Sequence, residues 1–267
     1  MKRLQKFSLW TAMISILFGI GLIGVGFMSG AFQHSLSDWN ITIGNYQVSG
    51  TKSIMETYQG VEKLDFKLGY CDIVIQPGTE FTISSERVGA NFESYVKDGT
   101  WHVKTGDTFG SSIRSSLEWI ERKSSTVVIT IPDIALKEMK LELGAGKLKV
   151  DSIKAEKLEF EVGTGKAEFT NSFVEKAKLE CGMGELNYQG ILGDDSSIEC
   201  GMGTSKVVLT GNEEDYEYNL KCGMGKIILN GTEHTSVDRK IDSTTKDAPK
   251  IKIECGMGRV ELLFQQS

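Results

Sequence analysis

Histidine and proline are scarce in this chain of 267 residues, with three of each. None of the histidines (His34, His102 and His234) stands beside a cysteine, so the clustered ligands typical of a zinc site are missing. No run of basic residues interleaved with aromatics occurs, and the formal net charge is −6, which argues against nucleic-acid binding. Nucleophile-elbow and zinc-protease motifs are also absent, so we expect no enzyme, no metal and no cofactor.

Residues 7–32 form an apolar segment that contains no charged side chain. About 20 apolar residues are enough to cross a bilayer as a helix, so the segment is long enough to span a membrane. Basic residues occur within residues 1–6 and then not again until Lys52. By the positive-inside rule, this asymmetry predicts a single-pass protein of the cell membrane, with the N-terminus in the cytoplasm and the C-terminal domain extracellular.

The predicted layout is a cytoplasmic N-terminus over residues 1–6, a transmembrane anchor over 7–32, a linker over 33–59 and an extracellular domain over 60–267. A cleaved signal peptide is the alternative, because Ser29 and Ala31 are small enough for a cleavage site. The apolar stretch of a signal peptide usually spans about 7–15 residues. The longer segment here therefore favours an uncleaved anchor, and cleavage stays open.

The tripeptide Gly-x-Gly recurs six times in the second half of the chain, at spacings of 19, 19, 19, 22 and 33 residues. Its glycines are Gly144, Gly146, Gly163, Gly165, Gly182, Gly184, Gly201, Gly203, Gly223, Gly225, Gly256 and Gly258. Apolar and polar residues alternate around each copy, which predicts strands with one buried face. The alternation slips by one residue at each tripeptide, as it does from Leu143 to Leu148. Such a slip is typical of a corner, where glycine accepts a positive φ.

Short strands joined by corners predict an all-β fold: a single-stranded β-solenoid with coils of about 19–22 residues and Gly-x-Gly corners, preceded by one N-terminal transmembrane helix. An earlier stretch around Gly69 fits the same template, with Cys71 in the slot of the second glycine. The middle residues of the tripeptides keep the inward parity, so we expect them to fill the core. They are Ala145, Thr164, Met183, Met202, Met224 and Met257.

Four copies of the repeat read Cys-Gly-Met-Gly, and their cysteines are Cys181, Cys200, Cys222 and Cys255. In the two preceding copies the same slot holds Leu143 and Val162. A slot shared by leucine, valine and cysteine is best interpreted as buried and apolar, where a free cysteine behaves as a small hydrophobe. We therefore expect an interior ladder of cysteines. Disulfides between neighbouring coils stay open outside the cell, whereas a metal site is disfavoured because no other ligands converge.

Two segments interrupt the array and are candidates for carrying specificity. Residues 104–125 contain apolar side chains at helical spacing, which favours a short helix packed on the end of the solenoid over a partner-binding face. Residues 231–248 are polar and fit a mobile loop better than a binding site. Glu180, Glu199 and Glu254 form an outward row, which we interpret as a solvated face rather than an active site.

The chain resembles the bacterial putative-adhesin family of membrane-anchored envelope proteins, over residue 60 to the C-terminus. The resemblance is carried by the stretches "VEKLDFKLGYCDIVIQPGTEFTI", "YVKDGTWHV" and "VVITIPDIALKEMKLELGAGKLKVDSIKAEKLEFEVGTGKAEF" together with the later Gly-x-Gly coils. It implies a β-solenoid without known catalytic residues and a surface role in adhesion or in the response to envelope stress. The Cys-Gly-Met-Gly coils and the long last spacing depart from the family pattern.

We accordingly expect a non-enzymatic envelope protein that acts as an adhesin-like binding protein or a stress-linked scaffold. Its partners would be the membrane, through the N-terminal helix, and an envelope protein or glycan. One alternative is a sensor that regulates a membrane signalling protein, although about six cytoplasmic residues leave little with which to signal. An enzyme acting on envelope polysaccharide is a further alternative, but it would need a groove of converging acids and bases.

Overall fold

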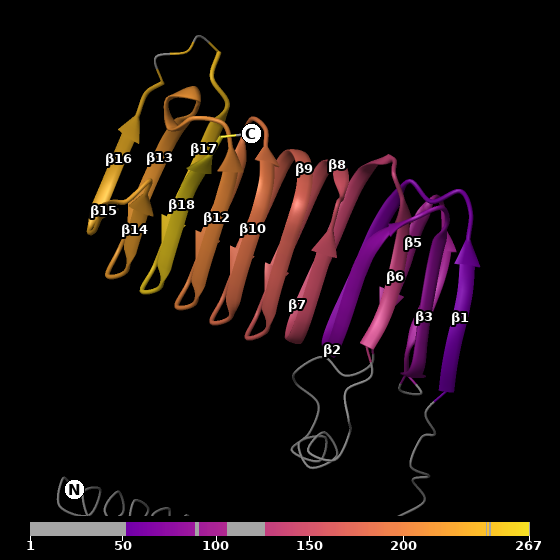
Figure 1. Cartoon of the computed structure of the whole chain (residues 1–267). Coiled ribbons are helices and arrows are strands. Elements are labelled where there is room, and N and C mark those ends of the chain that lie inside the picture. The colour runs from indigo at the N-terminus through magenta and orange to yellow at the C-terminus, as the bar shows by residue number, and fades with distance from the viewer. Residues whose placement is uncertain (1–51, 89–90, 106–125, 244, 246, 267) are drawn as a thin grey trace, which may run out of the picture. The chain divides into compact units, whose positions relative to one another are not determined.

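The computed structural model describes residues 52–88, 91–105, 126–243, 245 and 247–266 (Figure 1). The expected cytoplasmic N-terminus and anchor, and the candidate helix within 104–125, lie outside these residues. Within the described ranges, no helix has the length and apolarity needed to span a membrane. The membrane anchor therefore remains a prediction from the sequence.

The described chain is all-β apart from one 3-10 turn, η2 (Glu213–Asp215). In chain order the strands are β1 (Lys52–Tyr58), β2 (Lys63–Gly78), β3 (Phe81–Val88), β4 (Glu93–Lys97), β5 (Thr100–Lys104), β6 (Thr126–Pro132), β7 (Ala135–Asp151), β8 (Lys154–Val162), β9 (Lys166–Cys181), β10 (Glu185–Leu192), β11 (Ser196–Cys200), β12 (Thr204–Thr210), β13 (Glu217–Cys222), β14 (Lys226–Leu229), β15 (Thr232–His234), β16 (Val237–Ile241), β17 (Lys250–Cys255) and β18 (Arg259–Gln265). Strand β1 lies inside the expected linker, because its residues pair with β3 instead of standing free.

The strands stack as coils that fold back on themselves at the Gly-x-Gly tripeptides. Strands before the corners, such as β8, β11 and β17, form one layer, called here the pre-corner face, and strands after them, such as β10, β12 and β18, form the post-corner face (Figure 1). Successive coils pair in parallel and in register; β11 on β9 and β12 on β10 are examples. The core lies between the two layers, because alternate residues of both point inward.

Inward side chains of equivalent positions stack in rows through this core. On the pre-corner face one row runs Phe160, Leu179, Ile198, Ile253 and Leu220, in register from strand to strand. Each of these residues is at most 2% exposed. Since no single coil could bury such a row by itself, stability comes from the contacts between neighbours.

The coils do not stack in sequence order. Strand β17 lies between β11 and β13, and β18 lies between β12 and β14, so the last coil of the chain is inserted beside the coil of β11 and β12. The chain reaches this place through residues 231–248, for which we predicted a mobile loop. That prediction is wrong for β15 and β16, which pair antiparallel with β14 and β13 and cover the edge of the terminal coil.

The opposite end has a cap of the same kind. Strands β5 and β6 pair in parallel with the two halves of β2, and β4 and β3 then pair antiparallel with β5 and β6. Trp101 is fully buried in this cap, and its ring lies against those of Tyr58, Phe66 and Phe81. Antiparallel strands thus close both ends of the parallel array.

Close stacking of the backbone accounts for the glycines at the corners. A Cβ on Gly184 would lie 2.2 Å from the carbonyl oxygen of Gly165, and one on Gly203 would lie 2.3 Å from that of Gly184. We predicted instead that a positive φ would require glycine. Of the twelve corner glycines, all within the described ranges, only Gly146 has a positive φ, at 99°. Most of the corners therefore require glycine because the neighbouring backbone leaves no room for a Cβ, and not because the residue has a positive φ.

Candidate functional site

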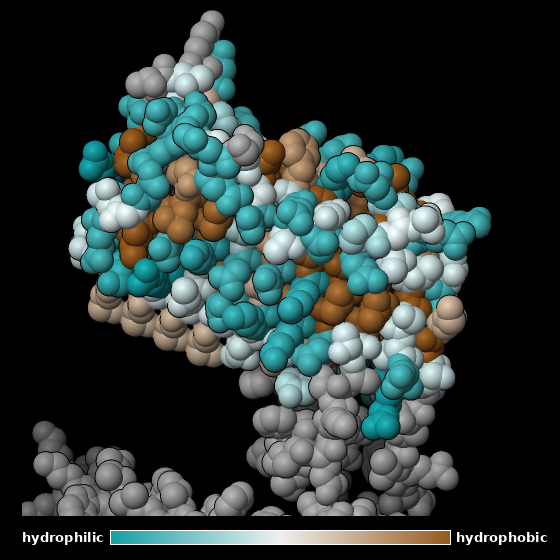
Figure 2. Space-filling view, in the orientation of Figure 1, coloured by the Kyte–Doolittle hydropathy of each residue, from teal (hydrophilic) through white to brown (hydrophobic). Residues whose placement is uncertain are grey.

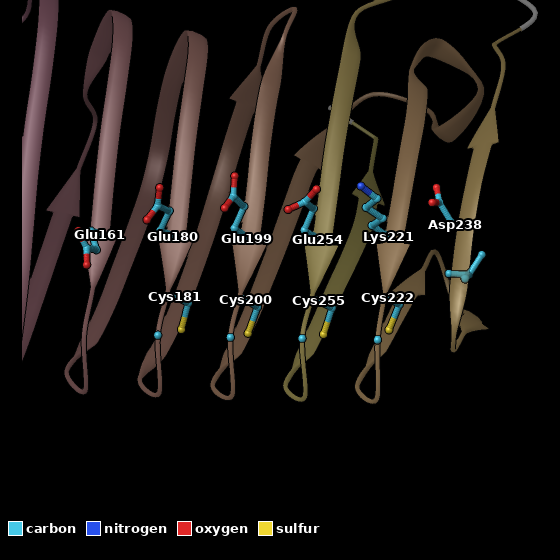
Figure 3. Close-up of a pocket in the computed structure, with 15 residues that line it drawn as sticks. Glu161, Glu180, Cys181, Glu199, Cys200, Lys221, Cys222, Asp238, Glu254 and Cys255 are labelled. Atoms are coloured by element: carbon cyan, nitrogen blue, oxygen red, sulfur yellow. The ribbon is translucent and has the colours of Figure 1, made fainter.

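Five glutamates stack in register on the outer surface of the pre-corner face, and Figure 3 shows the four that line a groove there. In spatial order they are Glu142, Glu161, Glu180, Glu199 and Glu254, which we call the acidic ladder. Neighbouring strands lie about 4.8 Å apart, so the carboxylates repeat at that interval. Lys67 pairs with Glu142 at one end, and Lys221 stands in register with Glu254 at the other. Three of these glutamates were predicted as an outward row, and the structure extends the row to five.

Lysines two residues earlier on the same strands neutralise part of the ladder. The Nζ of Lys252 lies 2.9 Å from Glu254, and Lys178 forms an ion pair with Glu180. Hydrogen bonding to these glutamates raises the pKa of both lysines. Among the described residues, Glu161 and Glu199 have no cation within 4.0 Å. The ladder therefore keeps an excess of negative charge.

The ladder borders a groove of about 630 Å³ on the pre-corner face. Lys221 and Asp238 extend its lining beyond the last glutamate, and Val237 adds an apolar contact. Asp238 belongs to β16, the antiparallel strand that covers the terminal coil. The groove thus combines parallel coils with the cap, and the cap residues fall in the segment predicted as a loop.

The four cysteines lie behind this groove in the spatial order Cys181, Cys200, Cys255 and Cys222 (Figure 3). All are buried, at most 7% exposed, and all are free thiols. A hydrogen bond between the first two raises the pKa of Cys181 and lowers that of Cys200, so these thiols titrate as a pair. Burial raises the pKa of Cys255 to about 11. The ladder order follows the inserted last coil, which the sequence spacing did not reveal.

The methionines of the same corners are exposed, so our prediction that they fill the core is wrong. Met183, Met202, Met224 and Met257 are 60%, 56%, 83% and 55% exposed. At the tip of a corner the backbone turns from one face to the other, so the side chain of the middle residue points away from the core. The alternation of inward and outward side chains holds within a strand and fails at the tip of the corner.

Groups that could perform catalysis do not converge in the described part of the chain. No three His, Cys, Asp or Glu side chains there are placed to hold a metal ion. The nearest approach to a catalytic pair is Asp65 with His102, whose Nδ1 lies 3.2 Å from the Asp65 carboxylate. Tyr95 stacks on that imidazole, with 5.0 Å between the ring centroids. An aspartate and a histidine need a nucleophile beside them to form a catalytic triad, so this pair is better interpreted as a surface contact of the cap.

Residues 133–254 match the family model Toastrack DUF4097, and the resemblance to the putative-adhesin family is confirmed. The fold is similar to that of a putative cell adhesion protein from Clostridium sporogenes, with 19% identity and a TM-score of 0.50 over 80% of this chain and 100% of that chain. A putative adhesin from Bacteroides fragilis matches with 14% identity and a TM-score of 0.32 over 79% of this chain and 97% of that one.

No curated protein matches the sequence. At 19% identity the likeness to the Clostridium sporogenes protein shows the fold alone. The resemblance to this family and the all-β fold are therefore established.

Proposed function

We propose that this protein is a non-enzymatic binding protein of the bacterial cell envelope, held in the cell membrane by residues 7–32 with its solenoid outside. The uncharged apolar segment and the basic residues before it support this orientation. The structural neighbour from Clostridium sporogenes is named a putative cell adhesion protein, and this name supports an adhesin-like role.

The acidic ladder is the observation that carries the binding role. Like charges in register on neighbouring strands repel one another, so such a row destabilises the fold unless cations compensate it. Lys178 and Lys252 compensate two of the glutamates, while Glu161 and Glu199 face the groove without a close cation. The arrangement suits a partner that presents positive charges in a row, such as an extended basic segment of another envelope protein.

The rigidity of the surface favours binding for a second reason. Every coil is tied to the next by backbone hydrogen bonds, so the carboxylates are held at a fixed repeat before a partner arrives. A preorganised surface loses less conformational freedom on binding. Attraction between the rows of charge should make association fast and dependent on salt.

Crosslinking on living cells, followed by identification of the partners, tests this function. The variant Glu199→Lys should lower the yield of the crosslinked partner by up to about fivefold, since exposed charge pairs contribute up to about 1 kcal/mol each. Glu168→Lys is the matched control: it makes the same charge change at an outward position of the post-corner face. Equal yields from the two variants would contradict a role for the ladder.

Two further outcomes separate the alternatives. If the ladder-dependent partner is a membrane signalling protein, the role is that of a sensor acting through the transmembrane segment. If the purified protein cleaves cell-wall glycans, the proposal of a non-enzymatic role is overturned.

A further inference from the structure

The exposed methionines form one continuous row on the molecule. Their spatial order is Met183, Met202, Met257 and Met224, because the last coil of the chain is inserted before that of β13 and β14. We call this row the methionine ridge. It is seen in Figure 2 as light-brown side chains along the lower edge, at the corners that lead into β10, β12, β18 and β14.

The backbone holds the ridge at a regular spacing. The backbone N–H of Met202 donates a hydrogen bond of 2.8 Å to the carbonyl oxygen of Gly182. The N–H of Met257 donates one of the same length to the carbonyl oxygen of Gly201. Each methionine stands between two glycines, so no neighbouring side chain on its own coil covers the thioether. The four sulfur atoms therefore belong to residues that repeat at about 4.8 Å along one edge.

Folding does not require these positions to be methionine. The equivalent corner tips in the coils of β7 and β8 carry Ala145 and Thr164, which occupy the same place in the same kind of turn. A threonine is at home in an exposed turn, whereas a methionine there leaves more than half of an apolar side chain in water. Four methionines in four adjacent coils thus indicate a task for the thioether itself.

The thioether is a soft, neutral ligand that suits Cu(I), whereas zinc sites and iron–sulfur clusters take their sulfur ligands from thiolates. Metal–sulfur bonds of about 2.3 Å, the length of zinc–thiolate bonds, place two sulfurs on opposite sides of one ion about 4.6 Å apart. That separation is close to the ~4.8 Å between stacked coils. A thioether also has no proton to lose, so it binds metal without the deprotonation that a buried thiol would need.

We propose that the methionine ridge binds soft monovalent metal ions, Cu(I) or Ag(I), with each ion held between the thioether sulfurs of neighbouring coils. Glu180, Glu199 and Glu254 stand three residues before three of these methionines and add negative potential beside the ridge. On the other side of the corners Arg259 and Lys226 oppose it, so the sulfurs and not the charges supply the selectivity. The proposal is independent of the binding partner proposed above.

Silver titration of the full-length protein in detergent micelles, with the methionine methyl groups labelled with carbon-13, tests the proposal. Ag(I) resembles Cu(I) in its preference for sulfur and needs no reductant. We expect the four ridge methyl signals to shift together and to saturate near about two equivalents, since four sulfurs taken in pairs hold two ions. The signal of Met55, which is 90% exposed on β1 and outside the ridge, should stay in place.

Three variants test whether the ridge thioethers themselves hold the ion. Replacing all four ridge methionines by leucine keeps an apolar ridge and should abolish this binding, whereas Met55→Leu should leave it unchanged. Replacing the four corner cysteines by valine should also leave it unchanged. Binding that survives the leucine variant, or that disappears with the cysteines, would overturn the proposal, as would equal shifts at Met55.

Discussion

The N-terminal cap and the corners of the cysteine coils are filled by residues of opposite size. At the N-terminal cap, the ring of Trp101 lies 5.0 Å from that of Tyr58, 5.4 Å from Phe66 and 6.1 Å from Phe81, measured between centroids. In the coils that carry the cysteines, the corners are filled by thiols and bare backbone. The difference follows from position: the cap holds its rings in the core between the layers, whereas at the corners the backbones of stacked coils lie too close for a Cβ on most of the glycines.

The first corner, at Cys71 and Gly146, also differs from the later corners in the reason for its glycine. In the first coil Cys71 occupies the slot of the second glycine, and a Cβ on Gly146 above it would lie 2.1 Å from the Cys71 carbonyl oxygen. Gly146 also has a positive φ there. In the later corners glycine stacks on glycine, and the close approach alone requires it. The first coil, with Cys71 in place of a glycine, is thus accompanied by an unusual backbone conformation at Gly146 in the coil stacked on it.

Removing the aromatic anchor should have the largest effect. Trp101→Ala deletes a fully buried ring and the hydrogen bond of 3.0 Å that its Nε1–H donates to Ser94. We expect a loss of about 3–5 kcal/mol in the free energy of unfolding, the usual cost of deleting a large buried aromatic side chain. Chemical denaturation measures it, with Tyr95→Ala, at a half-exposed position in the same cap, as control. A similar small loss in both variants would show that the cap does not anchor the fold.

A substitution at a regular corner should have the next largest effect. In Gly184→Ala the new Cβ would lie 2.2 Å from the Gly165 carbonyl oxygen, so the coils must separate. We expect a loss of about 2–3 kcal/mol, at the upper end for a strained backbone position. Gly182→Ala is the control in the same tripeptide, because its Cβ would keep 3.1 Å from the nearest atom. Thermal melts of the two should differ clearly, and equal melting temperatures would refute close stacking as the reason for glycine.

Replacing the buried Cys200 by valine should have the smallest effect on the free energy of unfolding. Val162 stands in register with Cys181 and occupies the same inward slot, so Cys200→Val places a tolerated side chain in an equivalent position. We expect a change within about 1.5 kcal/mol, as for other swaps of similar volume in a core. Denaturation curves and alkylation of the remaining thiols would check it. A loss as large as that at Gly184 would mean that the thiol hydrogen bonds stabilise the corner.

The sequence predicted most of the acidic ladder but not the lysine at its end. Alternation correctly predicted the outward row that contains Glu180 and Glu199, since each follows a buried residue of a regular strand. It could not reveal Lys221 at the end of that row. Lys221 comes from an earlier part of the chain than its neighbour Glu254, and no local pattern reports such a pairing.

The sequence by itself determined the coil, its corners and the inward side of the strands in the regular repeats, because these depend on periods of two and of about twenty residues that are local in the chain. Only the tertiary structure decided the order of the coils and the direction of the methionines. All coils present the same backbone edge to a neighbour, so pairing alone does not distinguish one order from another. In the structure β15 and β16 occupy the outer edge of β14 and β13, so the last coil pairs with the opposite edge, between β11 and β13 and between β12 and β14.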